Sequence, residues 1–351
     1  MMLKEYNFLN RRIVYGLGLV WLAVSFGMSI NGDSVDPRNL DSAVHLDPNL
    51  VMGVASCDKC HAAEVGVWKQ TPHSDTFLTL HRKPEARQIA DRMGVKSFKE
   101  DSTCMKCHYT VQSTAMGLDA IAGVSCESCH GAAQKWIQVH NDYGGQGITR
   151  DSESAEHRLA RLHASIEGGM RNPVNVYMVA QSCYRCHTVP DERLVNIGGH
   201  KEGSMDFEFV SWSQGMVRHN FLRSNGKTNE VSSPERLRLM FVAGMIADLE
   251  FSLRATAIAT EKATFGINSA QRADRAAKRL QAAQTKLNLP LLEEIHAVFK
   301  SLKLKLNNQQ ELSEAADRIA AIGVRFAATV SGDKLAAIDP FIPGQNCWKG
   351  K

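Results

Sequence analysis

Four short runs of the sequence have the residues that attach haem covalently. In each run, two cysteines are separated by two residues and are followed at once by a histidine. Two thiols at this spacing can form thioether bonds to the two vinyl groups of one haem, and the histidine then lies beneath the ring as an iron ligand. The sequence therefore predicts four haem c groups. Their attaching cysteines are Cys57, Cys60, Cys104, Cys107, Cys126, Cys129, Cys183 and Cys186, and their proximal ligands are His61, His108, His130 and His187.

Paired cysteines at this spacing also build zinc sites, which is the main alternative for these runs. A zinc site does not require histidine directly after each pair. Only 13 of the 351 residues are histidine, yet one follows every C-x-x-C pair. This adjacency favours haem over zinc.

A low-spin haem needs a second axial ligand, and the histidines outside the four runs are the candidates. His73 and His140 follow His61 and His130 so closely that each is expected to cross to a neighbouring haem. His219 is a candidate for the fourth haem. Four further histidines are more typical of hydrogen bonding than of iron ligation; they are His81, His157, His163 and His200.

The chain resembles the tetrahaem cytochrome c family of the electron acceptor of hydroxylamine oxidoreductase in ammonia-oxidising bacteria. The matching runs cover about half of the chain. They are CDKCHAAEVGVWKQTPH (57–73), CMKCH (104–108), GVSCESCHG (123–131) with His140, CYRCH (183–187) and MVRHN (216–220).

This resemblance implies a set of ligand pairs. His140 would ligate the first haem opposite His61, His73 the third opposite His130, and His219 the fourth opposite His187. The second haem, on His108, would have no distal protein ligand. The chain departs from the family in two places. The family has no counterpart of residues 232–335, and the segment between His140 and Cys183 differs. That segment and its surroundings offer other ligands for the second haem, namely His157, His163, Met116 and Met170.

The N-terminal residues have the pattern of an export signal. Lys4, Arg11 and Arg12 precede an apolar run from Ile13 to Ile30, which is also long enough for a membrane anchor. We therefore expect residues 1–30 to be a signal peptide or an anchor and residues 31–52 to be a linker. Either reading places the rest of the protein in the periplasm or elsewhere outside the cytoplasm. The formal charge of +4 omits the haem propionates and so does not indicate a nucleic-acid partner.

The C-terminal third has a different character. Ser233 and Pro234 begin a helix, and apolar residues then recur at helical spacing on four successive segments up to Phe326. We expect a mainly α protein: a multihaem domain with little regular structure at 53–225, an antiparallel helical bundle at 232–335 and a tail at 336–351. The ninth cysteine, Cys347, lies in that tail.

These features predict an electron carrier, with redox proteins as partners. A hydroxylamine-oxidoreductase-like or a quinol-oxidising complex is the candidate partner, and the bundle is a candidate for docking or self-association. The alternative is an enzyme that reduces a small nitrogen compound such as nitric oxide at an open second haem. The discriminating feature is the distal side of the haem on His108.

Overall fold

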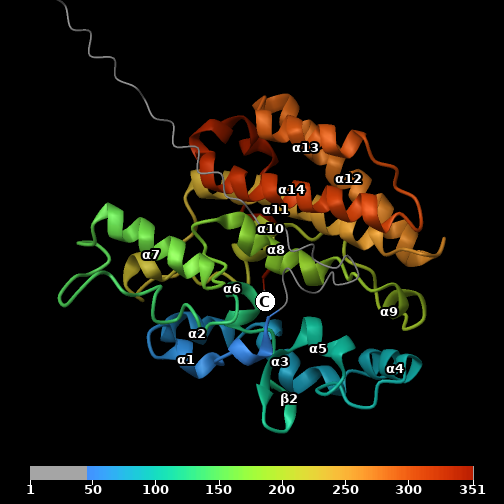
Figure 1. The fold of residues 1–351 in the computed structure, drawn as a ribbon, viewed down its shortest axis with the longest axis horizontal. Helices are drawn as coiled ribbons and strands as arrows, with labels where there is room; N and C mark the ends of the chain where they lie inside the picture. The colour runs from blue at the N-terminus through green and yellow to red at the C-terminus, as the bar shows by residue number, and fades with distance from the viewer. Residues whose placement is uncertain (1–45, 351) are drawn as a thin grey trace, which may run out of the picture. The chain divides into compact units, whose positions relative to one another are not determined.

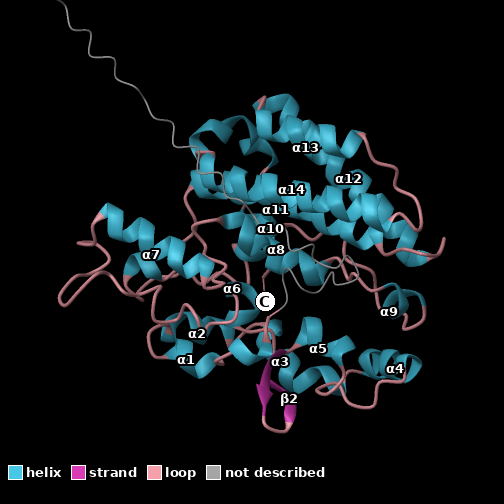
Figure 2. Ribbon diagram, viewed as in Figure 1, coloured by secondary structure: helices cyan, strands magenta, loops and turns pink. Residues whose placement is uncertain are grey.

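The structure, a computed structural model, describes residues 46–350, which lie in one compact unit. The expected signal or anchor at 1–30, and most of the expected linker, lie outside the described residues. The described part is mainly helical, as the sequence predicts, with one antiparallel hairpin of β1 (Thr110–Thr114) and β2 (Gly117–Ala122) (Figure 2). Between residues 46 and 350 no helix is long and apolar enough to cross a membrane.

The attachment runs lie on short helices joined by loops (Figure 1). The third run forms the whole of α6, and the second and fourth end α5 and α8. The first begins in α1, and its His61 precedes α2. The elements of this region are η1 (Pro48–Leu50), α1 (Val54–Asp58), α2 (Ala62–Trp68), α3 (Pro72–Thr79), η2 (Leu80–Arg82), α4 (Pro84–Met93), α5 (Ser102–His108), α6 (Cys126–His130), α7 (Ala155–Glu167), α8 (Val176–His187), α9 (Glu192–Asn196), α10 (Phe209–Ser213) and η3 (Leu222–Ser224).

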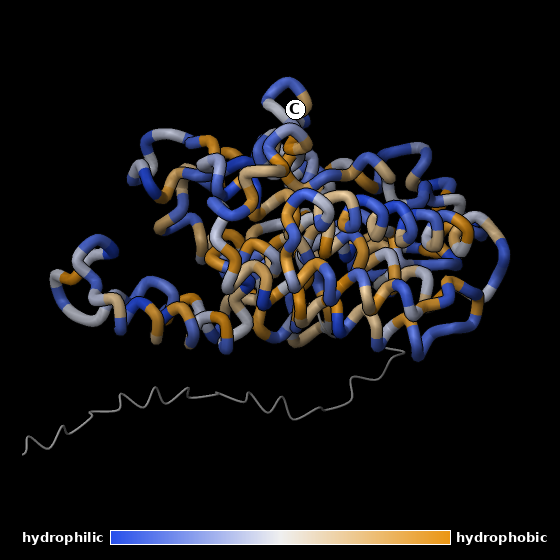
Figure 3. Tube along the Cα trace, turned by 90° about the horizontal axis from the view of Figure 1, so that it is seen from above, coloured by the Kyte–Doolittle hydropathy of each residue, from blue (hydrophilic) through white to orange (hydrophobic). Residues whose placement is uncertain are grey.

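Four helices with apolar faces follow, as the apolar periodicity predicts. They are α11 (Pro234–Ala257), α12 (Thr264–Leu287), α13 (Pro290–Lys300) and α14 (Gln309–Thr329), and the chain continues through η4 (Gly332–Phe341) and η5 (Gln345–Cys347). The Ser233 hydroxyl accepts a hydrogen bond from Arg236 N and caps α11, while Pro234 fills the first turn. The trace mixes apolar and polar residues along its helices (Figure 3). Helices α12, α13 and α14 each bury one face.

The core of the bundle extends across the boundary that the sequence suggests. Helix α11 is buried along most of its length and packs against α8 and α10 as well as α12 and α14. Tyr177 and Tyr184 of α8 lie in the same apolar cluster as Leu249 and Phe326 of the bundle. The attachment residues all lie before the bundle in the sequence, as expected. In the structure, however, the haem region and the bundle share one apolar core. Helix α8, which carries the fourth attachment run, is part of the bundle core.

Candidate haem sites

Attachment cysteines of different runs approach one another in pairs. Cys57 of the first run is hydrogen-bonded to Cys126 of the third, and Cys107 of the second run to Cys186 of the fourth. That hydrogen bond, together with burial, raises the pKa of the Cys107 thiol. Cys129 is near enough to Cys186 for the charges to interact. The runs thus follow one another in space in the order first, third, fourth, second.

Each proximal histidine faces a second histidine from elsewhere in the chain. The ring centroids are 6.3 Å apart for His61 and His140, 6.4 Å for His108 and His200, 6.1 Å for His130 and His219, and 6.3 Å for His187 and His73. An iron–histidine bond is about 2 Å long and its nitrogen lies about 1 Å from the ring centroid. Two imidazoles across one iron therefore have centroids about 6 Å apart. The spacing of all four pairs fits a haem iron between two histidines.

The second ring nitrogen of several of these histidines is held by the backbone. Nδ1 of His140 lies 2.8 Å from the Ile137 carbonyl, and Nδ1 of His219 lies 2.6 Å from that of Val217. His200 is held in the same way, with its Nδ1 2.7 Å from the Lys201 carbonyl. A carbonyl partner fixes the proton on Nδ1 and leaves Nε2 with its lone pair directed outwards. These side chains are therefore prepared for iron ligation through Nε2.

The paired histidines are also in the charge state that an iron ligand requires. Burial is the main cause that lowers the pKa of His108 and of His130 to about 4, and the facing histidine lowers it further in both. Burial likewise lowers the pKa of His187 to about 3 and shifts those of His73 and His140 downwards. These imidazoles are neutral near pH 7, and a neutral imidazole is the form that binds a metal.

The pairing differs from the one that the resemblance implies. His140 does face His61, but His73 faces His187 rather than His130, and His219 faces His130 rather than His187. The reason for the exchange is the position of α3. Thr76 Oγ1 donates hydrogen bonds to the carbonyl oxygens of both His73 and His108, at 2.8 and 2.7 Å. Helix α3 therefore lies beside the second run, which is in turn the neighbour of the fourth run and its His187.

The second site also differs from the expected open one, because His200 faces His108. Neither of the histidines that we considered for this site from the sequence approaches it. His157 bonds Glu153 at 2.8 Å, and His163 is an exposed residue paired with Glu167 at 3.3 Å. Met116 is almost fully exposed at the tip of the hairpin. His200 was not favoured by sequence reasoning because it lies in a loop without regular spacing from any attachment run.

Glu127, between the two cysteines of the third run, joins that run to the first. Its side chain is only 1% exposed, and its carboxylate accepts hydrogen bonds from the backbone N–H groups of Met52, Gly53 and Ala133 at 2.8–2.9 Å. Gly53 caps α1, where the first run begins. Sequence reasoning missed this residue, since the two positions between the cysteines carry no signal of their own.

Two arginines join the third run to the fourth. Arg185, between the cysteines of the fourth run, donates from Nη2 to the Ser128 carbonyl at 3.0 Å. The backbone N–H of Arg171 donates to the His130 carbonyl at 2.8 Å, and its guanidinium reaches Ser182 Oγ on α8 at 2.6 Å. Burial is the main cause that lowers the pKa of Arg171, to about 10. It remains a cation near pH 7 and is a buried positive charge between two attachment sites.

Comparisons with known proteins cover part of the region that holds these sites. Residues 56–131 match the family described as "Cytochrome c554 and c-prime". The match includes the first three attachment runs. The chain is also similar to "Cytochrome c-554" of Nitrosomonas europaea, with 32% identity over 103 residues, which is 26% of this chain and 43% of that protein. The chain thus spans less than half the length of this curated relative. No solved structure matches.

These matches support a multihaem c-type cytochrome, with covalently bound haem, that takes part in electron transfer. The fourth run, His200 and the helices α11–α14 all lie outside residues 56–131.

Proposed function

We propose that the chain is a tetrahaem cytochrome c that carries electrons between redox partners outside the cytoplasm. The observation that carries this proposal is the set of four histidine pairs with centroids 6.1–6.4 Å apart, each containing the histidine of one attachment run. Iron between two histidines has no open position for a substrate, and this is the usual form of an electron-transfer haem. The bound groups supply one-electron chemistry.

The role of the chain's own residues is to hold the sites rigidly and close together. The close approach of Cys57 to Cys126 and of Cys107 to Cys186 sets the first site against the third and the second against the fourth. Arg185 sets the third against the fourth. The sites then form one continuous series whose two ends, the first and the second site, are the natural points of entry and exit.

Ligand orientation is the second role of the chain, because the identity and hydrogen bonding of axial ligands tune a haem's potential. His61 differs from the other proximal ligands, because its Nδ1 lies 3.6 Å from the Glu64 carboxylate. A nearby carboxylate favours the oxidised, more positive iron. The Glu64 carboxylate therefore lowers the potential of the first haem.

The partners and the location follow from this proposal together with the sequence. The proposed partners are redox proteins, with a hydroxylamine-oxidoreductase-like or a quinol-oxidising complex as the candidate. The export pattern at 1–30 supports a location in the periplasm or elsewhere outside the cytoplasm. Docking or self-association is the proposed role of the bundle. The competing enzyme, a reductase with an open second haem, is disfavoured by the position of His200 opposite His108.

Intact mass after denaturation tests the haem count. We expect the mature protein to carry four haems per chain, and a double replacement of the cysteines in one run, such as Cys183→Ser with Cys186→Ser, to lower the count by one. Cys347→Ser is the matched control, because this exposed thiol belongs to no attachment run, and it should leave the count unchanged. A count of three or fewer in fully matured wild-type protein would refute the proposal.

The C-terminal residues should stabilise the site of His219. Lys349 donates to the Ser211 carbonyl and accepts from Met216 N at 3.0 and 2.8 Å, and a Cβ on Gly215 would lie 2.2 Å from the Lys349 carbonyl oxygen. Gly215→Ala should displace this segment, lower the free energy of unfolding by about 1–3 kcal/mol and leave part of the His130 haem high-spin by electron paramagnetic resonance.

Gly66→Ala is the matched control for this prediction, because a Cβ there would meet no atom within 4 Å. If the Gly215 variant is as fully low-spin as the Gly66 variant, the C-terminal segment has no role in holding His219.

A further inference from the structure

We propose that His200 is the sixth ligand of the second haem, and that α9, docked on the C-terminal helices, positions it. This inference rests on the proposed function and deepens it, because it closes the one site that the resembled family leaves open. His200 lies 6.4 Å from His108 between ring centroids, close to the 6.1–6.3 Å of the other three pairs. Its Nδ1 is occupied by the Lys201 carbonyl, so Nε2 is the nitrogen left for iron.

The loop that carries His200 is fitted against α4. Arg92 Nε donates to the Gly198 carbonyl at 2.7 Å. Gly199 has a φ of +67°, and a Cβ there would lie 2.9 Å from the Arg92 guanidinium, so a side chain would be strained as well as crowded. His200 N donates to the Leu194 carbonyl at 3.1 Å. The backbone on the N-terminal side of His200 therefore has a fixed course.

Helix α9, which precedes this loop, is anchored to the C-terminal helices. The Glu192 carboxylate accepts hydrogen bonds from Thr260 N at 3.0 Å, from Thr260 Oγ1 at 2.7 Å and from Glu261 N at 3.1 Å. Asn196 Oδ1 accepts from Phe265 N, the second residue of α12, at 3.0 Å. Val195 is buried in a small apolar cluster with Phe265, Ala255 and Ala259. Polar and apolar contacts thus hold α9 on the join between α11 and α12.

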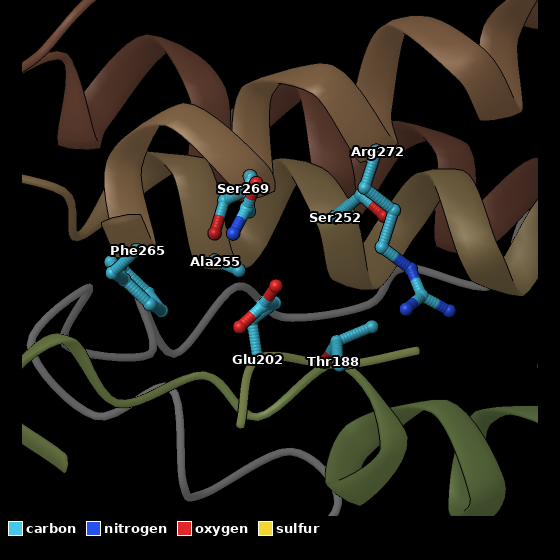
Figure 4. A pocket seen from close by; sticks show the side chains of 9 residues that line it. Thr188, Glu202, Ser252, Ala255, Phe265, Ser269 and Arg272 are labelled. Atoms are coloured by element: carbon cyan, nitrogen blue, oxygen red, sulfur yellow. The ribbon is translucent and has the colours of Figure 1, made fainter. Parts of the chain in front are cut away.

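The other side of the loop is anchored at the fourth site. A Cβ on Gly203 would lie 2.3 Å from the His187 carbonyl oxygen, so the loop passes directly over this proximal histidine. Arg272 of α12 donates to the Ser204 carbonyl at 2.7 Å and is paired with Asp248 at the same distance. Figure 4 shows Glu202 and Thr188 facing Ser269, Phe265 and Arg272 across a small pocket. His200 is therefore held between two anchored ends.

The C-terminal helices α11–α14, which have no counterpart in the resembled family, therefore have a function at the second site. They supply the support from which His200 reaches the second haem and converts an open site into a closed one. A closed site is low-spin and does not bind a diatomic ligand, whereas an iron with only a proximal histidine does.

The test is carbon monoxide added to the reduced full-length holoprotein, with electron paramagnetic resonance of the oxidised form and the haem count measured in parallel. The wild type should bind no carbon monoxide and show no high-spin iron. His200→Ala should make one haem in four high-spin and able to bind carbon monoxide, and added imidazole should restore the low-spin state. His163→Ala is the matched control, because this exposed histidine faces no other ring that we describe, and its spectra should equal those of the wild type.

Two further variants separate ligation from a general effect on folding. His200→Met keeps a side chain that can ligate iron, so it should stay low-spin but change the charge-transfer spectrum of one haem. Glu192→Ala removes the hydrogen bonds from Thr260 and Glu261 that help to anchor α9, without touching the site, and part of the same haem should become high-spin and revert with imidazole. Spectra identical to the wild type in the His200 variants would overturn the ligand assignment, and an unchanged Glu192→Ala spectrum would overturn the role of α9.

The two levels of the proposal fail in different ways. Carbon monoxide binding to one haem in four of the wild type, with the count intact, would overturn the role of His200 and leave the tetrahaem assignment in place. A count below four would overturn the proposed function itself.

Discussion

Glu127→Ala should lower the free energy of unfolding of the holoprotein by about 3–5 kcal/mol. The carboxylate accepts three backbone N–H groups in a site where it is only 1% exposed, and alanine leaves all three without an acceptor. Each unsatisfied buried donor costs about 1–3 kcal/mol, while water that enters the space recovers part of the loss. The measurement is the midpoint of guanidinium unfolding followed by circular dichroism.

The same change should also loosen the first site relative to the third, since Glu127 ties Gly53 to α6. Glu127→Gln retains one acceptor oxygen and the side-chain volume, so its loss should be about half as large. Glu156→Ala on the exposed face of α7 is the control and should stay within about 0.5 kcal/mol of the wild type. A loss for Glu127→Ala no larger than that of this control would mean that the carboxylate does not join the two runs.

Glu250→Ala should be similarly destabilising, for a different reason. This fully buried carboxylate of α11 accepts from Tyr177 Oη at 2.5 Å and Gln181 Nε2 at 2.8 Å, and it pairs with Arg254 at 2.8 Å. Burial, followed by this carboxylate, raises the pKa of Tyr177, so the tyrosine stays a neutral donor. Removal of one partner of a buried ion pair costs about 3–5 kcal/mol, because the other charge is left in a poor environment.

The expected loss for Glu250→Ala is reduced by Asp317, which also contacts Arg254 at 2.8 Å from an exposed position. Glu294→Ala is the matched control, because it breaks an exposed Arg–Glu pair with Arg325, which should contribute no more than about 1 kcal/mol. Thermal unfolding followed at the haem absorbance should show the Glu250 effect at the fourth site too, since Tyr177 and Gln181 belong to its helix. Equal losses in the two variants would show that the buried network does not hold α8.

The features that could be predicted from the sequence are those that depend on residues close together in the chain. The attachment cysteines and proximal histidines are fixed by a short spacing, and the helices α11–α14 are fixed by apolar periodicity and by caps such as Ser233. The ligand partners are not local. His73 and His219 each face a proximal histidine, but which one they face depends on how α3 lies against the second run.

Other features were invisible for the same reason. Nothing around His200 distinguishes it from a surface histidine until α9 is seen docked on Thr260 and Phe265. In the sequence, Glu127 resembles any solvent-facing glutamate of a short helix. Only the structure shows that the backbone N–H groups of Met52 and Gly53 bind its carboxylate. The shared core of α8 and α11 was missed because an amphipathic helix in the sequence does not reveal which neighbour covers its apolar face.

Anomalous diffraction at the iron edge from crystals of the holoprotein is the most direct test of the central claim. We expect four irons, one between each of the histidine pairs His61–His140, His130–His219, His187–His73 and His108–His200, adjacent in that order. An iron on His108 with no histidine opposite it, or His73 bound opposite His130, would contradict the account.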